Sequence, residues 1–369
     1  MRVLTGYSQR PTVIEAVAEI KRKLSGCSQP KLVMYFASMA YSQAELALAM
    51  KVAFPESVTF GCTTAGEIST GYMGQHSLVA LAANNTIFED VFLTVIENVN
   101  SQPTINESVK SIETHFNTSF DELDFTRYGG FVFTDGMSLG EERIMDRLGD
   151  LTNITVIGGS AGDDLQFKET FVFANGFAYK NASVLAVFKA ATPFSVLKTQ
   201  SFDICEPVLT ATRVDEANRK VLEFNNKPAA TAYAEAIGTN PTELPNFFMS
   251  NPLGLLSDGD PYVRSPQQIQ EQAVCFYCQV LEGMELSLLK SRDIVEDTKR
   301  DLDAKMAEFG QIACIFNFHC ILRTLELRAK NQEADYAALF NQVPTIGFST
   351  YGESYVGHIN QTSTMLVFA

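Results

Sequence analysis

The sequence predicts a mixed α/β fold of repeated βαβ units, in which helices cover mixed sheets and the chain forms two modules. Apolar runs of strand length alternate along the chain with amphipathic segments of helix length. Related turns, rich in glycine and hydroxyl residues, follow several of the predicted strands. Strands that alternate with helices and hairpins imply mixed sheets covered by helices.

The repeated turn occurs at residues 59–67, 155–163 and 345–353. The first and last copies share Thr, Gly, Thr, Gly and Glu at the same offsets, and the middle copy is looser. Each copy has apolar β-forming residues, then glycine, a hydroxyl residue, a second glycine and an acid. Self-similarity of this kind indicates inherited architecture.

The first βαβ unit begins with the apolar run 31–37, which predicts a strand buried on both faces. Residues 42–45, Ser-Gln-Ala-Glu, form a capping box and predict the start of a helix. Leu46, Met50 and Phe54 then recur every four residues, which predicts one apolar stripe on that helix. A second strand leads into the first copy of the turn.

The other two units repeat this order. Their predicted elements are strands at 130–134, 154–157, 312–322 and 344–346, a capping box at 138–141 and a helix at 333–340. A further strand is expected after each unit, at 77–82, 183–189 and 362–368. Another strand, 91–96, and a helix, 107–116, are expected between the first two units.

The length of 369 residues exceeds the usual size of one hydrophobic core, so two domains are expected. A polar cluster at 215–220 predicts the boundary, which gives modules 1–220 and 221–369. Residues 238–266 are rich in Pro, Asn, Asp and Gly and predict a long surface loop.

The charge balance argues against two classes of partner. Lys and Arg number 28 and Asp and Glu number 43, so the formal net charge is -15. An acidic chain repels phosphate backbones and anionic lipid, so neither nucleic acid nor a membrane is an expected partner. Glu15 and Glu19 interrupt the first twenty residues, which argues against a cleaved signal. A cytoplasmic location is expected, and the oligomeric state stays open, with a homo-oligomer among the alternatives.

Seven cysteines form an odd count without framework spacing, which favours reduced thiols. Cys275 and Cys278 form a Cys-x-x-Cys, but residues 273–280 have the pattern of a strand, whose alternation separates the two sulfurs. Buried thiols are favoured over a metal or redox site, although a response to oxidation stays open.

Residues 158–162, Gly-Gly-Ser-Ala-Gly, fit the Gly-x-Ser-x-Gly nucleophile elbow of serine hydrolases. That motif requires a helix after the serine, whereas residues 170–174 predict a strand. A hydrolase at Ser160 is therefore the weaker alternative, and we expect no catalytic residue and no enzyme. The turns themselves are either structural corners or donors of N–H and O–H groups to a small ligand, for which Thr63, Ser160, Glu67, Asp163 and Glu353 are the candidates.

Two histidines lie in polar rows on predicted strands. Asn317, His319 and Arg323 share one face of the strand 312–322 and its end. His358 and Asn360 alternate with Ile359 in a similar row. Buried polar groups need partners, so each row is either a hydrogen-bond network or a ligand site. An imidazole in an apolar pocket is the usual proximal haem ligand, with an arginine available for a propionate, so haem b held by His319 or His358 is one hypothesis.

Several separated motifs resemble the FIST family of sensory domains. They cover nearly the whole chain, at residues 61–68, 158–164, 221–229, 258–264, 347–353 and 358–362. The resemblance implies a sensory domain of bacterial signal transduction that binds a small ligand, with amino acids as the general ligand class. It also implies a narrower function, since some stand-alone FIST proteins are similar haem-binding nitric-oxide sensors that act on a separate histidine kinase.

Two sensor hypotheses follow. In the first, haem held by His319, with His358 as second candidate, binds nitric oxide, and the signal passes to a histidine kinase or a cyclic-di-GMP enzyme. In the second, a haem-free module binds an amino acid or similar metabolite, and Glu67, Glu353 and Arg323 pair with its charged groups. Asn317 and Asn360 are further candidate ligand-binding residues.

Overall fold

The computed structural model describes residues 2–257 and 259–369, so Asp258, the first residue of one FIST-like motif, lies outside the described residues. The chain divides into two compact units. The first comprises Met1–Lys198, Lys299–His358 and Ser363–Ala369, and the second comprises Thr199–Thr298 and Ile359–Thr362. The predicted boundary after residue 220 falls inside the second unit, and the division into sequence modules stays a prediction.

Three six-stranded sheets in the first unit follow one plan, which confirms the predicted mixed α/β fold. Two parallel strands lie at the centre of each sheet, an antiparallel strand pairs with the first of them, and another strand completes that side. In this order from the outside, the strands are β1 (Val3–Ser8), β6 (Leu78–Ala83), β2 (Leu32–Ala37) and β3 (Val58–Thr63); β7 (Phe88–Glu97), β12 (Ala182–Ala190), β8 (Tyr128–Thr134) and β9 (Thr155–Ser160); and β13 (Phe194–Thr199), β26 (Ser363–Phe368), β22 (Cys314–Cys320) and β23 (Thr345–Thr350).

Each sheet is completed by a hairpin from a different repeat. The hairpin that follows the first repeat joins the third sheet, that of the second joins the first, and that of the third joins the second. These hairpins are β4 (Glu67–Ser69) with β5 (Tyr72–Gly74), β10 (Val172–Ala174) with β11 (Phe177–Tyr179), and β24 (Glu353–Ser354) with β25 (His358–Ile359). The exchange runs in one direction around three repeats, so it forms a closed, threefold arrangement.

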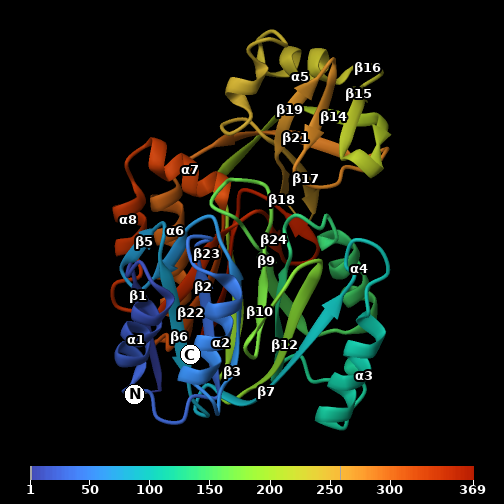
Figure 1. The fold of residues 1–369 in the computed structure, drawn as a ribbon. Coiled ribbons are helices and arrows are strands. Elements are labelled where there is room, and N and C mark those ends of the chain that lie inside the picture. The colour runs from blue at the N-terminus through green and yellow to red at the C-terminus, as the bar shows by residue number, and fades with distance from the viewer. Residues whose placement is uncertain (1, 258) are drawn as a thin grey trace. The chain divides into compact units, whose positions relative to one another are not determined.

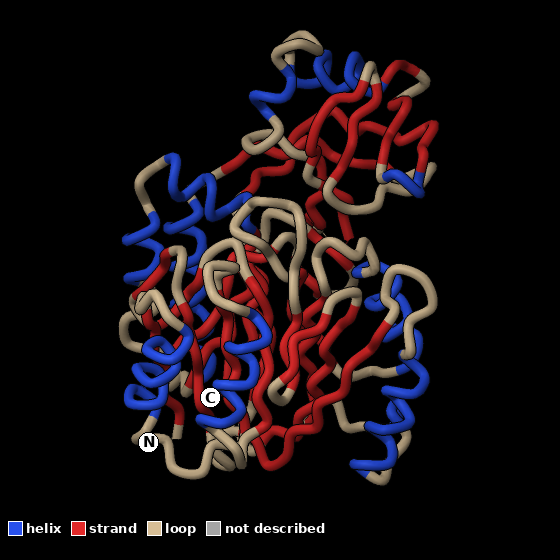
Figure 2. Tube along the Cα trace, viewed as in Figure 1, coloured by secondary structure: helices blue, strands red, loops and turns tan. Residues whose placement is uncertain are grey.

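Helices cover the outer faces of these sheets, and the strands lie inside (Figure 2). Helices α1 and α2 pack on the first sheet, and α3 and α4 pack on the second (Figure 1). The bounds are α1 (Val13–Leu24), α2 (Gln43–Ala53), α3 (Ile105–Phe116), α4 (Glu141–Leu151), α6 (Ile294–Phe309), α7 (Ile321–Ala329) and α8 (Glu333–Ala338). The inner faces meet in one phenylalanine-rich core, in which the Phe36 ring contacts those of Phe133, Phe318 and Phe348.

The second unit contains a sheet built mainly of antiparallel pairs, with α5 (Ala229–Ile237) packed on it. Its strands are β14 (Phe202–Asp215), β15 (Lys220–Phe224), β16 (Lys227–Pro228), β17 (Leu253–Ser257), β18 (Asp260–Arg264), β19 (Pro266–Gln270), β20 (Ala273–Phe276) and β21 (Glu285–Ser291). The predicted loop 238–266 therefore contains the hairpin β17–β18. Cys275 lies on β20 and Cys278 beyond its end; both are buried, and neither is part of a disulfide among the described residues.

Three local predictions were wrong. The capping box at 138–141 does not form, because Gly140 is the N-cap of α4 and the Ser138 hydroxyl donates to Asp135 O. Ser42 is the N-cap of α2, yet its side chain makes no capping hydrogen bond. The predicted strand 312–322 ends at Cys320, where α7 begins. The apolar pattern continues through this change because the start of α7 is itself buried.

The first glycine of each repeated turn is explained by packing. Gly61, Gly158 and Gly347 lie opposite Tyr35, Val132 and Asn317 of the adjacent parallel strand. A Cβ at these glycines would lie 1.6, 1.7 and 1.9 Å from the carbonyl oxygen of that opposite residue. The two backbones can approach this closely only without a side chain.

Alanine at Gly61 or Gly347 is expected to destabilise the protein by about 3 kcal/mol, because the backbone carbonyl cannot move aside. Gly149, in the interior of α4, is a matched control, since a Cβ there meets nothing within 4 Å. Gly149→Ala is expected to stabilise by about 1 kcal/mol through helix propensity. Urea unfolding measures all three, and a Gly61→Ala variant as stable as the wild type would contradict the packing explanation.

Candidate functional site

The repeated turns are joined directly to one another by backbone hydrogen bonds. Each pair of turns is connected twice. The bonds run from Ala65 N to Ser349 O (3.1 Å) and Ser349 N to Gly66 O (2.7 Å), from Gly162 N to Thr63 O (2.9 Å) and Asp164 N to Thr64 O (2.9 Å), and from Ser160 N to Gly352 O (2.9 Å) and Tyr351 N to Ser160 O (3.2 Å). The three turns therefore form one continuous structure.

The polar side chains of these turns form hydrogen bonds with other residues of the protein. The Thr63 hydroxyl accepts from Phe171 N at 3.0 Å, and the Ser160 hydroxyl donates to the Glu141 carboxylate at 3.0 Å. The Asp163 carboxylate accepts three backbone N–H groups. These contacts give each residue a structural role, and their predicted role in ligand binding stays a prediction. A loop rather than a helix follows Ser160, so the requirement of a nucleophile elbow is not met.

Glu67 is a fully buried carboxyl at the start of β4. It accepts hydrogen bonds from the Ser77 N–H at 3.0 Å and the Ser77 hydroxyl at 2.7 Å, and from the Thr64 hydroxyl at 2.5 Å. Burial raises its pKa to about 7, because removal from water disfavours the carboxylate more than these hydrogen bonds favour it. The negative charge of Asp164 acts in the same direction.

A second buried cluster surrounds His319 on the outer face of β22. The Asn317 amide donates to the Tyr336 hydroxyl at 3.1 Å and accepts from the Ser363 hydroxyl at 2.7 Å. The Tyr336 ring, from α8, lies 4.6 Å from the His319 ring between centroids. His319 has no exposed surface, and neither ring nitrogen has a hydrogen-bond partner among the described residues.

Arg323 lies in this neighbourhood although it belongs to a different element from the one predicted. It is on α7, not on the strand, and it is 2% exposed. Burial lowers the pKa of His319 well below its usual value, and the positive charge of Arg323 lowers it further. The imidazole is therefore neutral near pH 7.

The second predicted row does not form one strand. His358 and Ile359 make up the two-residue strand β25, and Gln361 has a φ of 50°, which breaks the extended path before β26. The His358 ring packs on Gly352, where a Cβ would lie 2.1 Å from His358 Cε1. Asn360 follows the end of β25 and falls in the second unit. Glu353 is fully buried on β24.

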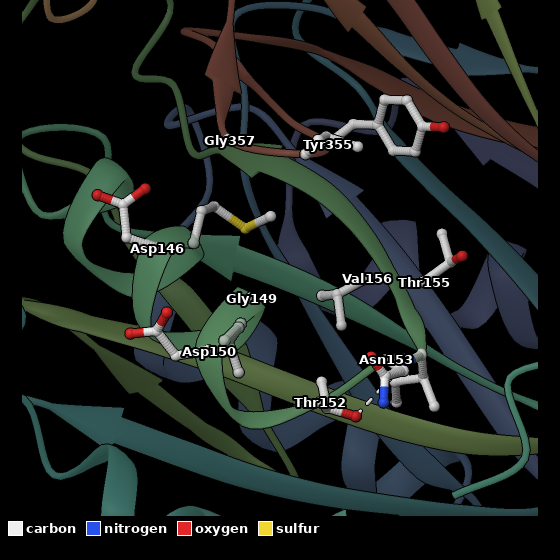
Figure 3. Close-up of a pocket in the computed structure, with 13 residues that line it drawn as sticks. Asp146, Gly149, Asp150, Thr152, Asn153, Thr155, Val156, Tyr355 and Gly357 are labelled. Carbon is white, nitrogen blue, oxygen red and sulfur yellow. Dashed lines mark hydrogen bonds between the residues drawn. The ribbon is translucent and has the colours of Figure 1, made fainter. Parts of the chain in front are cut away.

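An open pocket of about 600 Å³ lies beside β9, a feature that the sequence pattern did not predict. One wall is α4, the other is the first part of β9, and the loop after β24 closes one side (Figure 3). Its lining residues are Met145, Asp146, Leu148, Gly149, Asp150, residues 152–156, and Tyr355, Val356 and Gly357. Val356 in this loop has a φ of 51°, in the left-handed region that β-branched residues rarely adopt.

Comparison with known proteins identifies the family of the chain. Residues 31–227 match the FIST N domain, and residues 229–355 match the FIST C domain. The chain belongs to the FIST family. FIST domains are sensory, non-catalytic modules of signal transduction that bind small ligands.

One curated relative shares much of this FIST sequence. An uncharacterized protein of Methanocaldococcus jannaschii, MJ1623, is 27% identical over 333 residues, which is 83% of this chain. The chain spans 62% of the length of that relative.

Two further findings concern the described residues of this FIST protein. Among residues 2–257 and 259–369, the structure brings together no group of three or more His, Cys, Asp or Glu side chains able to hold a metal ion. In the same described part of the chain, no helix is both long and apolar enough to cross a membrane.

The pKa of Glu67 predicts a pH dependence of stability. Between about pH 4.5, where the unfolded carboxyl titrates, and about pH 7, the folded state holds a proton that the unfolded state has lost. The free energy of unfolding should therefore fall by about 3 kcal/mol as the pH rises through this interval, and level off above it.

Glu67→Gln reproduces the protonated side chain and should remove this part of the slope. Urea unfolding of both proteins at several pH values measures the difference. Parallel curves for the two proteins would show that Glu67 does not titrate in this range.

Proposed function

We propose that this FIST protein is a small-ligand sensor in which His319 and Arg323 bind an amino acid or a similar carboxylate metabolite. The observation that carries the proposal is the unpartnered, fully buried imidazole of His319. An imidazole buried without hydrogen bonds costs stability, so such a group calls for a structural or functional explanation. A ligand that accepts from one ring nitrogen and donates to the other supplies that explanation.

The charges of the cluster favour a carboxylate ligand. The neutral imidazole has one N–H donor and one acceptor nitrogen. The buried guanidinium of Arg323 adds a permanent positive charge next to it. A guanidinium binds a carboxylate through paired, charge-assisted hydrogen bonds. The nearby Asn317 amide and Tyr336 hydroxyl already bond to each other and hold the cluster in place.

Burial of the cluster also supplies the switch that a sensor needs. The Tyr336 ring of α8 covers His319, which has no exposed surface. In this proposal, a ligand reaches the imidazole when α8 moves away from β22. Binding would favour the conformation with α8 displaced, because only that conformation contacts the ligand. In this proposal, a separate histidine kinase or cyclic-di-GMP enzyme responds to the change.

Haem is the second candidate ligand, which would make the protein a nitric-oxide sensor. The donor chemistry at His319 fits, because a neutral imidazole nitrogen without a hydrogen bond is a usual axial ligand of iron. The packing does not fit as it stands, because a porphyrin would have to displace the Tyr336 ring from the face of His319. The open pocket is not lined by His319 or His358. An amino acid also requires α8 to move, but it is far smaller than a porphyrin and needs a smaller displacement, so the metabolite hypothesis is preferred.

His319→Phe separates the cost of the imidazole from its function. The free protein should gain about 1 to 2 kcal/mol, because the substitution removes two unpaired polar atoms from an apolar site. In a thermal-shift screen of the twenty amino acids, the ligand should raise the melting temperature of the wild type. The same amino acid should leave the melting temperature of His319→Phe unchanged. His115→Phe is the control, since His115 is partly exposed and bonds to Asp90 at 2.8 Å. A ligand-induced shift that survives in His319→Phe would rule out this cluster as the site.

An absorption titration with haem decides between the two ligands. If the metabolite proposal is correct, haem should give no saturable Soret band at one haem per chain. A band that is lost in His319→Ala or His358→Ala and shifts with nitric oxide would instead establish the gas sensor and identify the iron ligand.

A further inference from the structure

The threefold arrangement allows the same position to be compared in three sheets. Gly61, Gly158 and Gly347 are equivalent, so the residues two positions earlier, Thr59, Val156 and Thr345, are equivalent as well. Alternate residues of a strand direct their N–H and C=O groups to the same neighbour.

In the first and third sheets this position is occupied by the incoming hairpin. Beyond the end of β10, Asn175 bonds to both groups of Thr59: its N–H donates to Thr59 O at 2.7 Å, and its side-chain oxygen accepts from Thr59 N at 3.1 Å. Beyond β4, the Thr70 hydroxyl accepts from Thr345 N at 2.9 Å. Both hairpins also pair with three strand residues.

In the second sheet the incoming hairpin pairs with fewer strand residues. β24 pairs with Gly159 and Gly158 and then turns away through a Tyr355 N to Gly357 O hydrogen bond of 2.9 Å. The next residue to pair with Val156 would be Val356, which is instead in the left-handed region at φ 51° and 72% exposed. No hydrogen bond to the N–H or C=O of Val156 from this side is found among the described residues.

The open pocket lies at this unpaired position beside Val156. Val156 lies on its strand wall, and Asp146 and Asp150 lie on its helix wall (Figure 3). Met145 and Leu148, both largely buried, add apolar surface. The pocket therefore combines an unpaired strand edge, an apolar surface and two carboxylates, the features that recognise an extended peptide with a basic group.

We propose that this pocket binds a short extended peptide, one residue of which exchanges N–H···O hydrogen bonds with Val156 and completes the ladder as the sister hairpins do. An apolar side chain of the peptide would pack on Met145 and Leu148, and a cationic group would lie near Asp146 and Asp150. This site is separate from the His319 cluster, so it is a second binding activity and does not depend on the proposed metabolite.

Hydrogen exchange at the Val156 amide tests the proposal, with an equimolar pool of C-terminally amidated tripeptides as the probe. Exchange should slow at least tenfold when the pool is added. The same pool methylated on its central amide nitrogen lacks the donor for Val156 O and should protect much less. A mixture of the free amino acids at equal concentration should give little protection.

Gly149 offers a matched pair of variants, since it lines the pocket and a Cβ there meets nothing within 4 Å. Gly149→Leu should fill the pocket and abolish protection, whereas Gly149→Ala should retain it. The proposal is overturned if the pool gives no protection, if Val156 is already protected in the free protein, or if the methylated pool protects equally. Equal protection by the free amino acids would assign the pocket to a single amino acid and likewise overturn the peptide proposal.

Discussion

The hydrogen-bonded exchange of hairpins among the three repeats is the constraint on which the rest of the first unit depends. The last two strands of each sheet come from another repeat, and the turns that precede these hairpins are hydrogen-bonded to one another. The inner faces of the sheets are thereby held against one phenylalanine-rich core. The first glycine of each repeated turn is required because the two parallel strands approach more closely there than a Cβ allows.

The architecture is nearly symmetric, and both proposed binding sites lie where the symmetry fails. Of these three sheets, only the third places an asparagine and a histidine on the outer face of its first parallel strand. The equivalent outer positions of the first sheet are Tyr35 and Ala37. Only the second sheet receives a hairpin that turns away after two pairs. An ancestral repeat with three equal copies would need neither feature for stability, so both are reasonable places for acquired function.

Much of the fold was predictable because local pattern and tertiary packing agree. The apolar runs at β2, β8 and β22 are strands, and the repetition of the turn marks equivalent places in the sheets. Asn317 and His319 do share a face, since alternation is local geometry. Arg323 was assigned to the wrong element because a buried helix start and a buried strand end have the same apolar composition.

Other parts of the site depend on distant residues and have no local signal. Tyr336 contacts His319 from α8, a separate element, and the hydrogen bonds between the three repeated turns join residues far apart in the chain. The pocket arises from a missing pair at Val156, which no pattern within β9 can reveal.

The pairing of β4 with β23 has a consequence for synthesis on the ribosome. Ile346 pairs with Ser69, so β4 remains without this partner until β23 has been synthesised. Until then its edge is unpaired, and the apolar faces around it have no complete core. The sheet that contains β4 can therefore be completed only after residue 346 has been synthesised, and until then the exposed edge of this segment is a place where the nascent chain can pair wrongly.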